Sequence, residues 1–124
     1  MKPVKLKINT KTQQYPIIIG VNLVSNISKI LKKNSIKFKK CLLVIDKNVP
    51  KKFISQINKS LSSKEIYIQF FEASEINKNQ TNVNNILDIL LSKNFTRDDC
   101  LISLGGGITG DVCGFASSIF KRGL

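Results

Sequence analysis

Five consecutive apolar residues, Cys41 to Ile45, run directly into an acidic residue, Asp46. A strand with no polar residue on either face is typical of a parallel sheet whose two faces are both covered by helices. A second, largely apolar run, Cys100 to Leu104, ends in three consecutive glycines. Few architectures bury such strands on both sides. The two runs therefore predict an α/β fold.

Segments with helical periodicity separate the strand-like runs. Apolar residues recur at spacings of three and four over residues 23–31, 53–61 and 83–91, and a third strand is predicted over residues 66–70. Near the N-terminus, residues 4–8 and 15–20 are predicted to form an antiparallel hairpin. This order predicts a Rossmann-like parallel sheet with flanking helices and an N-terminal β-hairpin. Because three parallel strands are few for a doubly wound sheet, we expect residues 1–124 to be an incomplete domain.

The chain has no histidine among its 124 residues. This excludes a Ser-His-Asp or Cys-His pair, and any imidazole ligand or base, within the chain. The three cysteines, Cys41, Cys100 and Cys113, lack metal-binding spacing and are predicted to be buried, reduced thiols. With no continuous apolar signal segment and no apolar run long enough for a membrane span, we expect a cytoplasmic protein with no membrane partner.

The formal net charge is +12, but its distribution is uneven. Residues 1–64 carry 15 Lys and a single acid, Asp46, whereas residues 65–124 carry five basic and seven acidic groups. The excess is almost entirely Lys, with two Arg and 7% aromatic residues. Nucleic-acid recognition usually adds Arg or exposed aromatics. We therefore expect no nucleic-acid partner, although a basic nucleotide-binding module remains an alternative.

The three glycines, Gly105 to Gly107, stand between a buried strand and a helix. At such a junction, backbone N–H groups without neighbouring side chains can approach a pyrophosphate, and the helix dipole favours the anion. The spacing matches neither G-x-G-x-x-G nor a P-loop. A tight turn without a ligand explains the glycines equally well.

Polar residues follow each predicted strand at the edge where α/β sheets bind ligands. Asp46 and Asn48 follow the first parallel strand, and Glu75 and Lys78 follow the next. An acid at this edge can accept hydrogen bonds from ribose hydroxyls. The alternatives are that Asp46 caps the next helix or turn, and that Lys78 is an exposed charge.

Three further charged residues lie in the second half of the chain. Asp111 is predicted to begin the last helix, either as a cap or as an acceptor facing a ligand at the glycines. Arg122, one of two arginines in a Lys-rich chain, suggests bidentate anion recognition. Arg97 lies beside Asp98 and Asp99, where a surface ion pair is expected.

The string from Leu104 to Gly123 follows the pattern G-G-G-[VI]-x-G-D-x-x-G-F-x-[AS]-S-x-x-x-R-G. This pattern closely resembles the N-terminal half of the 3-dehydroquinate synthase family. Other segments resemble the same family: residues 15–20, the D-x-N-V of residues 46–49, the E-x-x-K of residues 75–78 and the R-x-D of residues 97–99. One departure is Ser74, which stands where the family has glycine. The resemblance spans essentially the whole chain.

The resemblance implies an NAD- and metal-dependent lyase of the shikimate pathway. Such enzymes convert 3-deoxy-D-arabino-heptulosonate 7-phosphate to 3-dehydroquinate and phosphate for aromatic amino acid biosynthesis. NAD is used catalytically, with a divalent metal, zinc or cobalt. The intact enzyme is expected to be a homodimer. Residues 1–124 would be a partial N-terminal NAD-binding domain.

The resemblance also assigns roles to individual residues. Arg122 would bind the sugar-phosphate substrate. The family's metal ligands lie outside this chain, and the C-terminal metal and substrate helical domain is absent from it. No catalytic or metal-ligating residue is therefore expected here, and we expect the chain alone to be inactive. The residues expected to bind NAD are Asp46, Asn48, Glu75, Lys78, Gly106, Gly107, Ile108, Thr109 and Asp111.

Two enzyme classes related to the synthases have similar motifs at the glycines. Glycerol and iron-dependent alcohol dehydrogenases usually read G-G-G-S at the glycines and lack the G-F…R-G continuation, so residues 108–111 argue against them. Sugar-phosphate cyclases that make aminocyclitol precursors share nearly all of the motif and remain an alternative.

Overall fold

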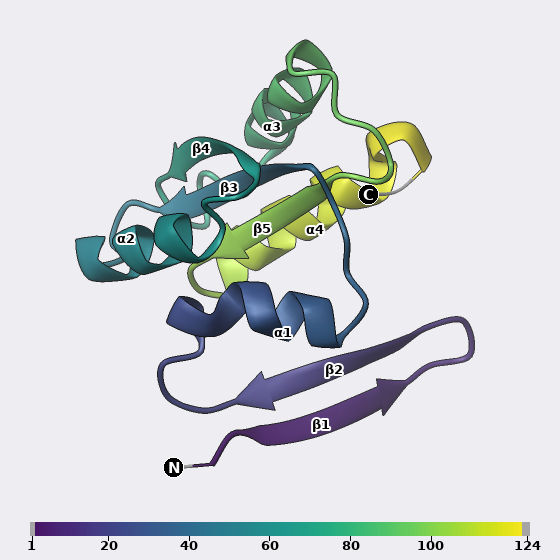
Figure 1. Cartoon of the computed structure of the whole chain (residues 1–124). Coiled ribbons are helices and arrows are strands. Elements are labelled where there is room, and N and C mark those ends of the chain that lie inside the picture. Colours follow the sequence, from purple (N-terminus) through teal and green to yellow (C-terminus); the bar gives the residue numbers. More distant parts are fainter. Residues whose placement is uncertain (1, 123–124) are drawn as a thin grey trace.

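The computed structural model describes residues 2–122. For Arg122 it describes only the backbone. Two strands, β1 (Val4–Asn9) and β2 (Gln14–Ile19), form an antiparallel hairpin that lies beside α1 (Figure 1). The remaining elements alternate between helix and strand. They are η1 (Val24–Asn26), α1 (Ile27–Lys33), β3 (Lys40–Asp46), α2 (Lys51–Ser60), β4 (Glu65–Phe71), α3 (Gln80–Ser92), β5 (Cys100–Leu104), α4 (Gly107–Ile119) and η2 (Phe120–Arg122).

The parallel sheet has the order β4-β3-β5, so the strand with the continuous apolar run lies at its centre. Residues Cys41 to Ile45 of β3 are fully buried. This burial explains why the strand has no polar residue on either face. The predicted fold class is confirmed: a parallel sheet with flanking helices and an N-terminal hairpin.

Side chains alternate across β3 and build one core on each face of the sheet. Leu42 and Val44 pack with residues of α3 and α4, including Leu90 and Val112. Cys41, Leu43 and Ile45 pack on the other face, with Ile57 of α2 and with partly buried residues of α1. The result is a three-layer arrangement in which two helices cover each face (Figure 1).

The parallel crossovers place the carboxyl ends of β3, β4 and β5 at one edge of the sheet. The loops that carry the predicted site residues follow these ends. Asp46 pairs in register with Phe71 at the end of β4, and Ile45 pairs with Leu104 at the end of β5. The loops that follow these strands therefore start side by side, as the carboxyl ends of parallel strands do.

The last helix starts earlier than the sequence predicts. Asp111 was expected to begin it, but α4 begins at Gly107 with Gly106 as its N-cap residue, so Asp111 lies in the second turn. Glycine has a low helix propensity, so the sequence does not indicate a helix at Gly107. The first turn of a helix nevertheless accepts glycine, because it requires little beyond accessible φ and ψ angles. Within residues 2–122, no helix has the length and apolar character needed to cross a bilayer.

Candidate functional site

The glycine loop between β5 and α4 has one glycine packed tightly and two facing open space. A Cβ on Gly105 would lie 2.9 Å from Thr109 Oγ1 and 3.0 Å from the Cβ of Asp46. The φ of Gly105, +157°, is also one that side chains rarely adopt. A Cβ on Gly106 or Gly107, in contrast, would meet no atom within 4 Å. Gly105 is thus explained by packing, whereas the protein's own packing does not require the other two to be glycine.

The backbone at this point presents unpaired donors. Gly110 N–H donates to the carbonyl of Gly106 at 3.1 Å, which closes the first hydrogen-bonded turn of α4. The N–H groups of Gly107, Ile108 and Thr109 precede that turn, where an α-helix offers its donors no intrahelical acceptor. No side chain caps this end of the helix. The helix N-terminus can therefore receive an anion such as a pyrophosphate.

The side chain of Thr109 points into the protein rather than toward a ligand at the loop. It is fully buried, and its hydroxyl has no hydrogen-bond partner in the described part of the chain. Its Oγ1 lies against the space where Gly105 has no side chain. The group that Thr109 offers to a ligand is therefore its backbone N–H.

The loop after β4 brings two predicted site residues together. Lys78 Nζ lies 2.9 Å from Asp111 Oδ2, which joins this loop to α4. The hydrogen bond to Asp111 raises the pKa of Lys78, and the Asp111 and Glu75 charges raise it further. Lys78 and Asp111 also line a hollow of about 320 Å³ between α3 and α4. Lys78 is thus exposed, as the alternative interpretation has it, and is also paired with Asp111.

Ser74, which stands where the resembled family has glycine, stabilises this loop. Its Oγ accepts the N–H of Asn77 at 3.2 Å, and its carbonyl accepts the N–H of Lys78 at 3.2 Å. Asn79 then caps α3 by accepting the N–H of Asn82 at 3.0 Å. The serine thus holds a tight turn by local hydrogen bonding.

Asp46 ends β3 and begins the turn that leads to α2. Its Oδ1 accepts the N–H of Asn48 at 3.1 Å, an Asx turn, and its carbonyl accepts the N–H of Val49 at 3.0 Å. This local role is the one that the alternative interpretation gave it. The hydrogen bond uses one of two carboxylate oxygens, so Asp46 retains an acceptor beside the glycine loop.

The remaining predicted residues are less constrained. Asn48 and Glu75 are exposed, and no side-chain hydrogen bond fixes either of them among the described residues. The side chain of Arg122 lies outside the described residues. The expected surface ion pair of Arg97 does not form within residues 2–122. Asp99 is instead held by the N–H groups of Thr96 and Lys40.

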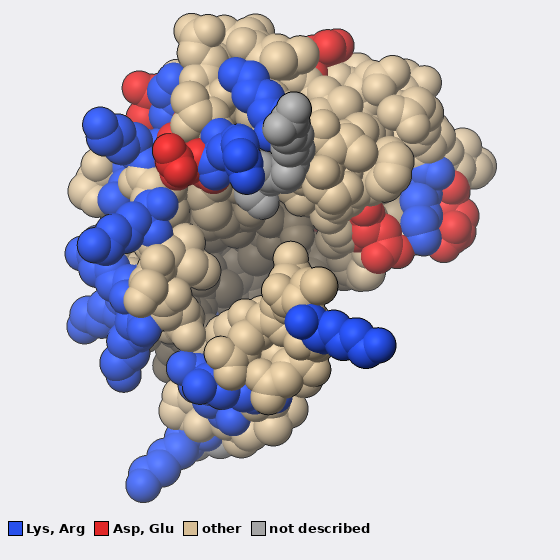
Figure 2. Space-filling model, turned by 90° about the vertical axis from the view of Figure 1, so that its right-hand side faces the viewer, with Lys and Arg blue, Asp and Glu red and all other residues tan. Residues whose placement is uncertain are grey.

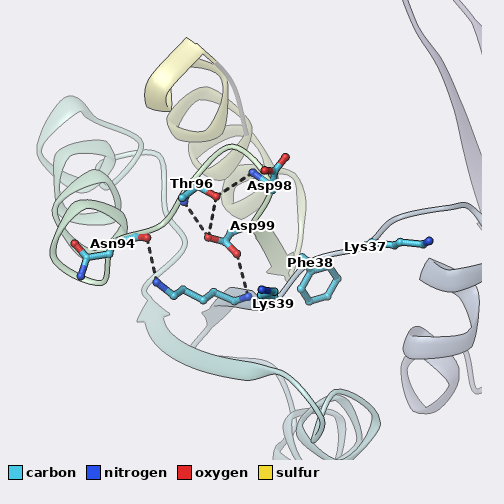
Figure 3. A pocket seen from close by; sticks show the side chains of 8 residues that line it. Lys37, Phe38, Lys39, Asn94, Thr96, Asp98 and Asp99 are labelled. Atoms are coloured by element: carbon cyan, nitrogen blue, oxygen red, sulfur yellow. Dashed lines mark hydrogen bonds between the residues drawn. The ribbon is translucent and has the colours of Figure 1, made fainter.

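Another hollow lies away from the glycine loop. It measures about 510 Å³, opens at the amino ends of β3 and β5, and is lined by residues 37–40, Asn94, Thr96, Asp98 and Asp99 (Figure 3). Lys40 Nζ is occupied there by the carbonyls of Lys93 and Asn94. The polar groups of this hollow bond mainly to one another, which indicates a structural role.

Metal binding and electrostatics add two constraints. Within the described residues, no group of three or more His, Cys, Asp or Glu side chains could hold a metal ion. On the face shown in Figure 2, Lys and Arg side chains are most frequent along the left edge, and others are spread over the rest of that face. Among the described residues, the uncapped N-terminus of α4 can receive an anion, and no cluster of ligating side chains is arranged to hold a metal ion.

Comparison with known proteins agrees with the family resemblance of the sequence. Residues 68–124 match the family described as 3-dehydroquinate synthase N-terminal. The chain is 60% identical over 121 residues to a 3-dehydroquinate synthase of Pelagibacter ubique and 36% identical over 120 residues to one of Alkaliphilus metalliredigens. These alignments cover 98% and 97% of the chain. The chain spans about a third of the length of these relatives, 33% in each case.

Among solved structures, the fold is similar to that of 2-deoxy-scyllo-inosose synthase complexed with carbaglucose-6-phosphate, NAD⁺ and Co²⁺. The TM-score is 0.84 at 19% sequence identity, over 98% of this chain and 33% of the other. At this identity, the similarity establishes the fold. It confirms the α/β architecture with its N-terminal hairpin.

Proposed function

We propose that this chain, whose residues 68–124 match the family described as 3-dehydroquinate synthase N-terminal, is the NAD-binding part of a 3-dehydroquinate synthase. The reaction proposed for the intact enzyme converts 3-deoxy-D-arabino-heptulosonate 7-phosphate to 3-dehydroquinate and phosphate. One relative that carries this name is 60% identical to the chain. The sugar-phosphate analogue in the related cyclase structure supports a sugar-phosphate substrate.

One observation carries the proposal: the open space over Gly106 and Gly107 at the uncapped N-terminus of α4. Backbone N–H groups of residues 107–109 would donate to the pyrophosphate of NAD, and a side chain at either glycine would fill the space. Asp46 would accept from a ribose hydroxyl with its remaining carboxylate oxygen. When bound, NAD supplies reversible hydride transfer.

The charged residues of the site would position the cofactor. Lys78 would neutralise Asp111, which removes a negative charge that would otherwise oppose the phosphates on the same helix. Glu75 and Asn48 would complete the contacts with the cofactor from two neighbouring loops. Arg122 would bind the substrate phosphate. These roles follow from the family resemblance together with the positions of the loops at one edge of the sheet.

The divalent metal proposed for the intact enzyme, zinc or cobalt, has no site among the described residues. Because the sequence also contains no histidine, the chain itself supplies no metal-centred step. We expect no phosphate release when the purified chain is incubated with substrate, NAD and zinc. Turnover under these conditions would contradict the proposal that this chain supplies no metal-centred step.

The decisive measurement is NAD affinity, by calorimetric titration, of the wild type and two glycine variants. Gly107→Ala places a methyl group in the open space of the loop and is expected to weaken NAD binding about tenfold or more, which is about 1.4 kcal/mol. Gly114→Ala is the matched control, since it also adds a Cβ to α4 with nothing within 4 Å. Equal affinities in all three proteins would refute the assignment of the loop.

Salt dependence separates this proposal from a basic nucleic-acid-binding module. NAD carries few phosphate charges, so its binding releases few counterions. Its affinity should therefore change little between low and moderate salt. Binding of an oligonucleotide to the lysine-rich side should fall steeply as salt increases. Tight, salt-sensitive oligonucleotide binding without NAD binding would favour the module.

A related sugar-phosphate cyclase is the second candidate. It is favoured by the structural similarity to 2-deoxy-scyllo-inosose synthase, at a TM-score of 0.84. Both candidates predict NAD binding at the glycine loop. Substrate specificity of the complete enzyme, assayed with each sugar phosphate, distinguishes them.

A further inference from the structure

Two of the three cysteines are neighbours on adjacent strands, far from the glycine loop. Cys41 at the start of β3 is paired in register with Cys100 at the start of β5. Side chains of directly paired residues in a parallel sheet point to the same face, and adjacent strands lie about 4.8 Å apart. Both cysteines pack in the same core cluster, beneath α1 and α2. The separation of the two Cα atoms is within the range that a disulfide spans.

The two thiols differ in their access to solvent. Cys41 is fully buried at the centre of the sheet, whereas Cys100 is partly exposed on the outer strand. Cys100 lines a hollow of about 360 Å³, together with residues 35–38, 97–99, 101 and 117. A small oxidant can therefore reach Cys100 directly, whereas Cys41 has no surface exposed to solvent.

We propose that Cys100 is a modification site, oxidised by hydroperoxides and then captured by Cys41 as an intramolecular disulfide. This property is independent of the proposed NAD site, because β5 separates Cys100 at its start from the glycines beyond its end. Neither sulfur has a role in the proposed cofactor binding.

The electrostatics of the pair favour Cys100 as the attacking sulfur. Hydrogen bonding from the Cys41 thiol lowers the pKa of Cys100, against burial and the Asp99 charge, which raise it. The same interaction, together with burial, raises the pKa of Cys41. The thiolate is the nucleophilic form of cysteine, so Cys100 reacts first.

The chemistry takes two steps. The Cys100 thiolate attacks the hydroperoxide, an S–O bond forms as the O–O bond breaks, and the alcohol or water leaves with a proton. Cys100 is then a sulfenic acid, oxidised by two electrons. The Cys41 sulfur attacks it, the S–S bond forms, and the S–O bond breaks. The hydroxyl leaves with the Cys41 proton as water, so two thiols and one hydroperoxide give one disulfide, one alcohol and one water.

Cys113 provides an internal control. It is buried among residues of the other core cluster, on the opposite face of the sheet. Burial raises the pKa of the Cys113 thiol to about 12. In the folded chain Cys113 should therefore react more slowly than Cys100 with both alkylating agents and peroxide.

The test treats the native chain with hydrogen peroxide, alkylates the remaining thiols and digests the product with a protease that cleaves before aspartate. Cleavage before Asp46, Asp99 and Asp111 places each cysteine in a separate peptide: residues 1–45, 99–110 and 111–124. Mass spectrometry should find the first two peptides cross-linked, with the loss of two hydrogen atoms and with reversal by reduction. Cys113 should remain alkylated.

Before oxidation, alkylation of Cys100 should be about tenfold faster than that of Cys113. Equal rates for the three thiols in native buffer would overturn the proposal. Oxidation of Cys100 to the sulfinic acid without a cross-link would also overturn it, because Cys41 would then not capture the intermediate.

Two variants sharpen the result. Cys113→Ala should form the cross-link as the wild type does. Cys41→Ala should abolish it and leave a sulfenic acid at Cys100 that dimedone labels. If Cys41→Ala does not fold, the peptide pattern of the wild type and of Cys113→Ala decides the question.

Discussion

Lys78 Nζ lies 2.9 Å from Asp111 Oδ2 and ties the loop after β4 to the second turn of α4. The two residues are 33 positions apart in sequence, and the parallel crossovers bring them together. Both side chains are substantially exposed, at 43% and 60%. At that exposure the ion pair contributes little to stability, so its main effect is to orient both groups at the glycine edge of the sheet.

The first prediction concerns the pH range of this ion pair. Because Asp111 raises the pKa of Lys78 in the folded chain, its stabilisation is fully present below the ordinary lysine pKa of about 10.4. It is lost as the pH rises through the folded value. Lys78→Met should therefore melt slightly below the wild type at neutral pH and together with it at strongly alkaline pH. A difference that grows with pH would contradict the pairing.

The second prediction concerns the tightly packed glycine. Gly105→Ala forces a Cβ to within 2.9 Å of Thr109 Oγ1 and 3.0 Å of the Cβ of Asp46. The overpacking should lower the free energy of unfolding by about 1–3 kcal/mol, as measured by urea denaturation. Gly107→Ala is the control. Its Cβ enters open space, and its higher helix propensity should leave stability unchanged or increase it by up to about 1 kcal/mol.

The third prediction concerns the unpaired hydroxyl of Thr109. Thr109→Val replaces a buried, unpartnered Oγ1 with a methyl group of similar size. Removing the desolvated polar atom should raise the free energy of unfolding by about 1 kcal/mol, seen as a higher melting temperature. The neighbouring Ile108→Val tests whether any change at this end of α4 has the same effect. A loss of stability in Thr109→Val would show that the hydroxyl has a partner.

The fourth prediction concerns Asp99, whose carboxylate accepts the N–H groups of Thr96 and Lys40 at 2.9 and 3.1 Å. Burial raises the pKa of Asp99, but these two hydrogen bonds, the Lys40 charge and the Thr96 hydroxyl together lower it below its ordinary value. Its stabilisation is therefore present above the unfolded pKa of about 3.9 and is lost as the pH falls through the folded value. Asp99→Asn should cost about 1 kcal/mol at pH 7, since the carboxylate is only partly buried.

The Asp99 comparison is made by chemical denaturation at several pH values. The two proteins should converge in stability as the pH falls through the lowered pKa of Asp99 in the folded chain. Asp98→Asn is the matched control, because no backbone N–H donates to its carboxylate in the described structure. A difference between wild type and Asp99→Asn that persists in acid would assign the effect to shape rather than charge.

The strand and helix pattern was predictable because it depends on local periodicity. The fully apolar run of β3 identified the central strand, and the spacing of Val83, Ile86 and Leu90 identified the buried face of α3. The start of α4 was not predictable, because two of its flanking residues are glycines. The position of a helix start among glycines depends on tertiary contacts such as that between Gly105 and Asp46.

Site residues on separate loops were predictable as a group but not as contacts. Their shared edge follows from the parallel sheet, whereas the bond between Lys78 and Asp111 depends on the packing of α3 against α4. The cysteines show the same limit. Burial of Cys41 and Cys113 was predicted correctly, but Cys100 is only partly buried because β5 is an outer strand of the described sheet.

The hairpin of β1 and β2 is a separate two-stranded sheet, with six register pairs from Val4 and Ile19 to Asn9 and Gln14. Ladders of two strands are marginally stable in water, whereas β3 is paired on both sides and fully buried. The backbone amides of the hairpin should therefore exchange with deuterated water through local opening alone. Those of β3 should exchange through global unfolding, so isotope uptake would divide one short chain into two kinetic regions.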